Sequence, residues 1–164
     1  MQTLSNSIRE YSAQLQKGQI QEAYKGIMSF MSVLKTHLQS RYPQYVVSGL
    51  YPGYMDMTYF AFTPPELKDQ NLKIAIVYLH KENRFELWLG GRNRKVQAEY
   101  IEFFKEKDIA PYKLSHVSPG VDSIIESIVS EQPDFDDSES LMQNIEEKIV
   151  EFAEKILFLL PKNA

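Results

Sequence analysis

Residues 45–91 read YVVSGLYPGYMDMTYFAFTPPELKDQNLKIAIVYLHKENRFELWLGG and contain four apolar runs rich in aromatic and β-branched side chains. Alternation between apolar and polar positions within these runs is typical of β-strands. The runs cover residues 45–51, 54–62, 72–80 and 84–91. Pro52-Gly53 separates the first two and has the chemistry of a type II turn, and Glu82-Asn83 separates the last two. The stretch therefore predicts two consecutive β-hairpins, around which the remaining chain must pack.

One face of the second hairpin is expected to be core. The opposed pairs would be His80 with Phe85, Tyr78 with Leu87, and Ile76 with Leu89. The opposite face would carry Val77, Glu86 and Trp88 and is also largely apolar. In the first hairpin the same reasoning places Asp56 opposite Gly49. The connection through Pro64-Pro65 is too long to decide whether Asp56 and Glu86 point to the same side.

The flanking segments are mainly helical in pattern. Apolar residues at helical spacing predict two antiparallel helices over residues 4–16 and 19–40, separated at Lys17-Gly18. The remaining expectations are a helix after Asn93, a short edge strand at 112–116, a brief helix at 121–130 and a final helix at 141–160. We therefore expect one α+β domain spanning residues 1–164. It has an antiparallel sheet of four to five strands with helices packed on it. The N-terminal helical hairpin and the helix after the sheet lie against one face, and the C-terminal helices cover the rest.

Composition excludes several classes of protein. The 164 residues contain no cysteine, so disulfides, thiolate nucleophiles and cysteine zinc sites are excluded. Neither a signal peptide nor a membrane-spanning run is recognisable, so a cytoplasmic location is expected. The net charge of −4 argues against nucleic-acid binding. Charge is uneven, since residues 121–164 hold eleven acids against three bases. This acidic segment is either a solvated face or a cover for a basic site elsewhere.

The basic cluster at Arg92–Lys95 follows two glycines and precedes a helix. Asn93 is placed to cap that helix, which puts Arg94 and Lys95 in the first turn, where cations oppose the helix dipole. Unpaired backbone N–H groups, flexible glycines and three cations together favour an anion site. The alternative is a strand end followed by solvated basic residues.

A catalytic site is harder to assemble. Asp56 and Glu86 lie on successive predicted strands, and two carboxylates are what a Mg²⁺ ion needs. Nucleases of this kind carry Glu-x-Lys on the second strand, but here the third position is Trp88. The three histidines are His37, His80 and His116, and none has metal-site spacing with another ligand, so no cofactor is expected.

The motifs GYMDMTYFAFTP, LKIAIVYLH, FELWLGGRNRKVQ and PDFDD together resemble a family of small bacterial proteins classed only as a domain of unknown function. The resemblance covers nearly the whole chain, from the Lys17-Gly18 break to the final helix. It implies no activity, ligand or catalytic residue.

The function expected from the sequence is a non-enzymatic binding module for a small anionic ligand or a protein partner. The expected site comprises Tyr54, Asp56, Glu86, Trp88, Arg92 and Arg94, with arginines holding the anion and aromatic rings forming an apolar wall. One alternative is a metal-dependent phosphodiesterase or nuclease using Asp56 and Glu86. Another is a structural or oligomerising protein, since the apolar tail of the final helix would suit burial in a homodimer as well as in the domain.

Overall fold

A computed structural model describes residues 1–161, and its centre is a six-stranded antiparallel sheet with the order β1-β2-β3-β4-β6-β5. The strands are β1 (Val46–Val47), β2 (Met57–Thr63), β3 (Leu72–Leu79), β4 (Arg84–Gly91), β5 (Lys113–Leu114) and β6 (Ser123–Glu131). The helices are α1 (Leu4–Lys17), α2 (Gln19–Arg41), α3 (Pro65–Lys68), α4 (Arg94–Phe104) and α5 (Ser138–Leu159). The α+β class is confirmed, but the sheet has more strands than the four to five expected.

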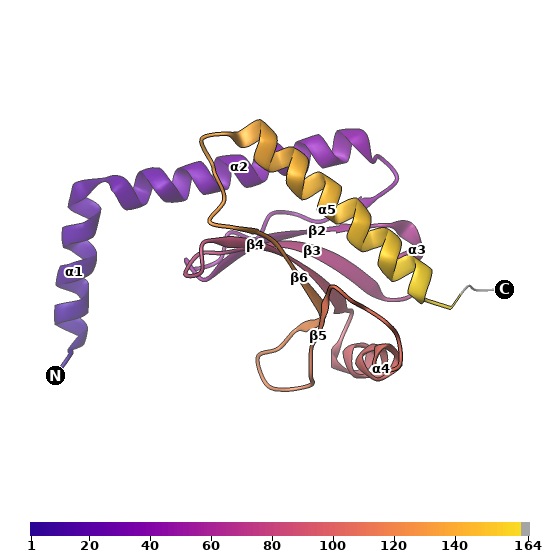
Figure 1. Ribbon diagram of the computed structural model, residues 1–164. Helices are drawn as coiled ribbons and strands as arrows, with labels where there is room; N and C mark the ends of the chain where they lie inside the picture. The colour runs from indigo at the N-terminus through magenta and orange to yellow at the C-terminus, as the bar shows by residue number, and fades with distance from the viewer. Residues whose placement is uncertain (162–164) are drawn as a thin grey trace.

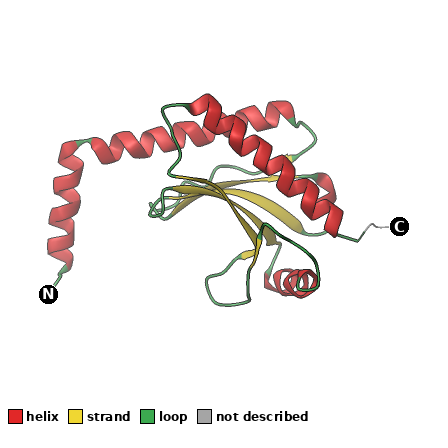
Figure 2. Ribbon diagram, viewed as in Figure 1, coloured by secondary structure: helices red, strands yellow, loops and turns green. Residues whose placement is uncertain are grey.

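The layers are unequal (Figures 1 and 2). Helices α2 and α5 lie over one face of the sheet, and α4 lies on the opposite side at one end. This arrangement differs from the expectation that the helix after the sheet would share a face with the N-terminal helices. A single long helix, α5, ends the described chain, where more than one C-terminal helix was expected. Part of the sheet face beside α4 therefore has no helix over it.

The core lies between the sheet and the pair α2 and α5. Tyr78 pairs with Phe85 and Ile76 with Leu87, and all four side chains are buried, as expected for this face. The pairing is displaced by two residues from the predicted one, because the turn takes all of His80–Asn83 and Asn83 adopts a positive φ of 49°. A shift by an even number preserves which residues share a face.

Helices α2 and α5 contribute apolar residues at helical spacing to this core. From α2 the buried residues are Phe30, Met31, Leu34 and Leu38. From α5 they are Leu141, Ile145, Ile149, Phe152, Ala153 and Ile156. Residues three and four apart occupy one side of a helix, so these sets form continuous stripes against the sheet.

The first hairpin is looser than expected. Gly53 has a positive φ of 74°, as the Pro52-Gly53 pair predicts, but the connection continues through Asp56 before β2 begins. Tyr51 is bridged to Tyr59, and the predicted pairing of Asp56 with Gly49 is wrong. The longer connection moves Asp56 out of the sheet and into a turn.

A strand, β6 at Ser123–Glu131, stands where a brief helix was predicted at 121–130. Strand β6 pairs with β4 along its length, with shifts in register between Phe85 and Glu86 and between Leu89 and Gly90. Ile124, Ile125 and Val129 are buried, and β-branched side chains of this kind pack well on a pleated sheet. The short edge strand expected at 112–116 is confirmed as β5, which pairs with β6.

Helix α1 does not pack back along α2. Gly18, between α1 and α2, adopts the left-handed conformation with φ at 82°. At this residue the chain bends, so that α1 lies at a steep angle to α2 and apart from the sheet (Figure 1). No residue of α1 is buried, and its apolar stripe of Leu4, Ile8 and Tyr11 is more than half exposed at each position. The predicted helical hairpin is therefore wrong, although both helices are present. Among residues 1–161, no helix combines the length and apolarity that crossing a bilayer would require.

Candidate functional site

The sheet face that α2 and α5 leave open holds a cavity of about 310 Å³ beside the start of α4. We call this the β4–α4 cavity. Its apolar lining is Met57, Tyr59, Ala75, Val77 and Trp88, and its polar lining includes Lys73, Arg92, Arg94, Gln97 and Asp122. A volume of this size falls at the lower end of the range for small-molecule sites. Three of the six residues expected from the sequence, Trp88, Arg92 and Arg94, lie here.

Gly91 brings α4 close to the end of β4. A Cβ atom at this position would lie 2.8 Å from the backbone nitrogen of Gln97, so no larger residue fits without displacing the helix. Gln97 is buried and donates from Nε2 to the carbonyl oxygens of Val121 and Ser123, at 2.8 and 3.1 Å. Asn93 caps α4 by accepting from the Val96 N–H at 2.9 Å, as predicted. The close contact at Gly91 and the buried amide of Gln97 therefore fix the position of α4 at the side of the cavity.

The three cations that line the cavity differ in whether they are paired with an acid. The Arg94 guanidinium lies 3.1 Å from the Asp122 carboxylate and also donates to the Val121 carbonyl and to Gln97. Within residues 1–161, Lys73 and Arg92 take part in no ion pair. Both also line a second hollow of about 630 Å³ on the side toward β1, so they stand between two cavities. Lys73 and Arg92 are therefore the charges available to a ligand.

Glu86 belongs to a closed network next to the cavity. Its side chain is 4% exposed and accepts from Arg84 Nε at 2.6 Å and from Trp88 Nε1 at 2.8 Å. The hydrogen bond to Glu86 raises the pKa of Arg84 above its ordinary value. The hydrogen bond from Trp88 to this carboxylate holds the indole in place. Because Arg84 balances the charge of Glu86, the carboxylate does not neutralise the cations of the adjoining cavity.

Tyr54 and Asp56 lie outside the β4–α4 cavity. They belong to the turn before β2, which is at the far end of the strands from Arg92. Tyr54 is 89% exposed, and its backbone N–H donates to Asp56 Oδ1 at 2.9 Å. That hydrogen bond is the main cause of the lowered pKa of Asp56, with smaller contributions from neighbouring backbone N–H groups and His80. The carboxylate of Asp56 thus stabilises a turn.

Asp56 and Glu86 are not brought together. Tyr59 pairs with Val77, which pairs with Glu86 on the next strand. Asp56 comes three residues before Tyr59, so it is three residues along and two strands across from Glu86. The spacing of residues along a strand and of strands across a sheet puts their Cα atoms roughly 14 Å apart. Across residues 1–161 no group of three or more histidines and acids is placed to hold a metal ion. The two-carboxylate hypothesis therefore receives no support from this geometry.

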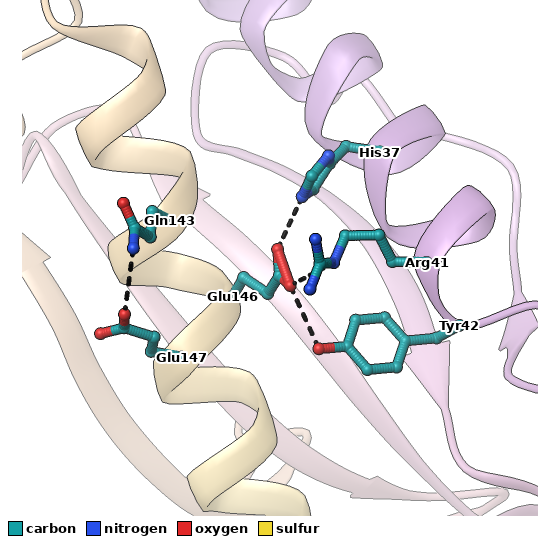
Figure 3. A network of polar contacts seen from close by, with 6 residues as sticks. All are labelled: His37, Arg41, Tyr42, Gln143, Glu146 and Glu147. Carbon is teal, nitrogen blue, oxygen red and sulfur yellow. Dashed lines mark hydrogen bonds and ion pairs between the residues drawn. The ribbon is translucent and has the colours of Figure 1, made fainter.

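A second polar cluster, missed by sequence reasoning, joins α2 to α5 (Figure 3). Glu146 of α5 accepts from His37 Nε2 at 2.6 Å, from Arg41 Nε at 2.9 Å and from the Tyr42 hydroxyl at 3.1 Å. The Glu146 side chain is only 13% exposed. Burial and the hydrogen bond to Glu146 raise the pKa of Tyr42. With every carboxylate oxygen occupied, the cluster acts as a link between the two covering helices.

The acidic segment does not cover the basic cluster as a unit. The Gln132 N–H donates to the Asn83 carbonyl at 2.9 Å, which places the acid-rich linker after β6 at the start of β4, whereas Arg92 follows its end. Phe135 of this linker packs against Phe30 and Phe85 in the core. Asp122 is the acid of residues 121–161 that pairs with the cluster, through Arg94.

Lys73, Tyr59 and Asp122 are cavity residues that sequence reasoning did not select. Lys73 carried a signal, because it is the one charged residue in the buried run LKIAIVYL of β3. A charge at such a position reaches solvent only if the sheet face there is open. Tyr59 and Asp122 gave no comparable signal, since their placement depends on strand pairing and on the loop before β6.

Comparison with known proteins agrees with the likeness inferred from the motifs. No curated protein and no solved structure gives a match. A family model described as a domain of unknown function (DUF7000) matches residues 4–160, from the start of α1 to just beyond the end of α5. The match covers the β4–α4 cavity and the link between α2 and α5 alike. The chain therefore belongs to this family, the domain of unknown function DUF7000.

Proposed function

We propose that this protein is a binding module for a small anionic ligand, which it holds in the β4–α4 cavity. The observation that carries the proposal is the pair Lys73 and Arg92, two cations without an acidic partner in residues 1–161 at the mouth of a cavity with an apolar floor. Unpaired cations beside a partly desolvated surface attract anions more strongly than the same charges on an open surface do.

The six residues first expected divide into three roles under this proposal. Arg92 binds the anion together with Lys73, and Arg94 fixes the rim through Asp122. Trp88 forms the wall, and Glu86 holds it there. Tyr54 and Asp56 have no part in binding, because the turn that contains them lies at the other end of the sheet.

Thermal denaturation in the presence of phosphate, citrate, sugar phosphates and nucleotides tests the proposal. A ligand at a hundred times its dissociation constant adds about 2.7 kcal/mol to the free energy of unfolding, which raises the melting temperature by several degrees. The variants Lys73→Ala and Arg92→Ala should each reduce the rise. Lys95→Ala is the matched control, because Lys95 is an exposed cation in the first turn of α4 that does not line the cavity.

A second candidate function, binding of a protein partner, is favoured by the exposed apolar stripe of α1. Exposed amphipathic helices of this kind are common recognition elements. Failure of every anion to stabilise the protein, with α1 required for association, would favour this candidate over the first.

A further inference from the structure

We infer that the ligand of the β4–α4 cavity carries a flat ring system, which lies against Trp88 while its anionic group reaches Lys73 and Arg92. This inference rests on the proposed function and narrows it to one chemical class, a planar aromatic anion. Three features of the cavity support it: the shape of its floor, the fixed indole wall, and the position of the cations relative to both.

Part of the floor is shallow because small residues occupy it, between larger lining residues such as Tyr59, Val77 and Trp88. Ala75 on β3 is directly opposite Trp88 on β4, and Gly90 comes two residues after Trp88 on the same face. Side chains on one face of a sheet stand upright at neighbouring positions, so small ones in a row leave a shallow, planar hollow between their larger neighbours. A ring fits such a hollow better than a branched or globular group does.

The wall is an indole that is held in one position. Trp88 Nε1 donates to Glu86, and Glu86 is in turn fixed by Arg84. The one polar atom of the indole is therefore satisfied within the protein, and what Trp88 offers a ligand is its ring surface. A ring fixed before binding loses little conformational freedom when a second ring stacks on it, which favours stacking.

The cations lie at one end of this hollow. Lys73 is two residues from Ala75 on the same face, about 7 Å along the strand. Its side chain runs beside Gly90, with Cε 3.6 Å from where a Cβ atom of that residue would be. Arg92 follows Gly91 at the same end. A ligand that stacks on Trp88 and also reaches Lys73 and Arg92 therefore has its ring and its anionic group about 7 Å apart, the length of two residues along a strand.

Trp88 is the only tryptophan in the chain, so its fluorescence reports on the wall directly. We would titrate the full-length protein with two matched pairs of anions. AMP and ribose 5-phosphate share a phosphate and differ by the flat base; 2-naphthoate and its fully saturated counterpart share a carboxylate and differ in flatness. Adenosine supplies a ring without an anion. The two pairs also distinguish a nucleotide-like ligand from an aromatic carboxylate.

We expect the flat member of at least one pair to bind at least about five-fold more tightly than its partner and to change the emission of Trp88, as ring stacking of ordinary strength requires. By calorimetry, Trp88→Leu should lower the affinity for the flat member toward that of its partner and so remove this preference, and Trp88→Phe should restore part of it. Arg92→Ala should weaken both members of the pair equally. Should Trp88→Leu fail to fold, Ala75→Val tests the same hollow by filling it.

Each other outcome overturns a different statement. Equal binding of flat and non-flat anions refutes the ring inference and leaves the anion site standing. Adenosine binding as tightly as AMP refutes the role of Lys73 and Arg92. Absence of binding by all five compounds, together with no thermal stabilisation by any other anion, refutes the proposed function itself.

Discussion

Trp88 donates its indole N–H to Glu86, two residues earlier on the same face of β4, and the Nε1–Oε1 distance is 2.8 Å. The other oxygen of this buried carboxylate accepts from Arg84 at 2.6 Å. Neighbours two apart on a strand point the same way, so the sequence Arg84-Phe85-Glu86-Leu87-Trp88 builds the whole network from one strand. The pattern that resembled part of a metal site is instead the support of an aromatic wall.

Removing the Glu86 carboxylate should therefore destabilise the fold. In Glu86→Ala, Trp88 Nε1 and the half-buried Arg84 guanidinium lose their shared acceptor, at a cost of about 1–3 kcal/mol. Urea denaturation measures the change. The control is Glu82→Ala in the turn before β4, where the side chain is exposed and a change below about 0.5 kcal/mol is expected. Equal effects of the two substitutions would contradict the role given to Glu86.

The contact of Gly91 with α4 should be sensitive to a single methyl group. Gly91→Ala places a Cβ atom 2.8 Å from the Gln97 nitrogen and must displace α4. We expect the free energy of unfolding to fall by about 1–3 kcal/mol and anion binding to weaken. Gly90→Ala is the neighbouring control for stability, because its Cβ atom would meet nothing closer than 3.6 Å. Denaturation of both variants and ligand titration of Gly91→Ala check this. A stable Gly91→Ala protein with normal binding would show that α4 is not fixed by this contact.

Features that depend on neighbouring residues could be predicted from the sequence, whereas features that depend on pairing between distant segments could not. The core face of β3 and β4 was predictable, because alternation at Ile76, Tyr78, Phe85 and Leu87 is local. The register was not, because the turn at 80–83 is longer than the shortest one compatible with the pattern. Residues 121–130 were misassigned because short runs of isoleucine and valine fit a buried helix as well as a strand, and only pairing with β4 decides between them.

The candidate site was half predictable for the same reason. The Gly-Gly-Arg junction and Trp88 are visible in the sequence, and they do lie together. Lys73 comes from another strand, and Asp122 from the loop before β6, so their contribution depends on tertiary pairing. Asp56 was misplaced because the first hairpin has a longer connection than Pro52-Gly53 alone implies.

Glu146 should contribute to holding α5 on α2. Glu146→Ala leaves His37, Arg41 and Tyr42 without their common acceptor, and burial of this site predicts a loss of about 1–3 kcal/mol. Glu147→Ala changes the next residue, which is exposed, and serves as the control with an expected change near zero. Chemical denaturation compares the two. A similar small effect for both would mean that apolar packing alone joins the helices.

His80 should make the fold less stable in mild acid. Burial lowers its pKa below the ordinary 6.5, with partial compensation from the charge of Asp56, and its Nε2 is 2.8 Å from the Thr58 hydroxyl. The unfolded chain therefore takes up this proton at a higher pH than the folded protein does. Stability is complete above about pH 6.5 and decreases as the pH falls from 6.5 toward the lowered pKa.

Two measurements check the behaviour of His80. NMR titration of its imidazole should give a pKa below 6.5, and His80→Gln should reduce the slope of stability against pH between 7 and 5. His116→Gln is the control, because that side chain is exposed. An unchanged slope in His80→Gln would assign the acid sensitivity to other groups.

Helix α1 should be dispensable for the fold. None of its residues is buried, so a chain beginning at Gly18 loses no core contacts, and the expected change in the free energy of unfolding is below about 1 kcal/mol. Phe30→Ala in α2 gives the contrast, because this buried ring packs on Phe85 and Phe135 and its removal should cost about 3–5 kcal/mol. Sedimentation of the two lengths of chain supplies a second readout. If the apolar stripe of α1 joins copies of the protein, the full-length chain alone will associate and its melting temperature will rise with concentration; if both lengths are monomeric, the stripe does not join copies of the protein.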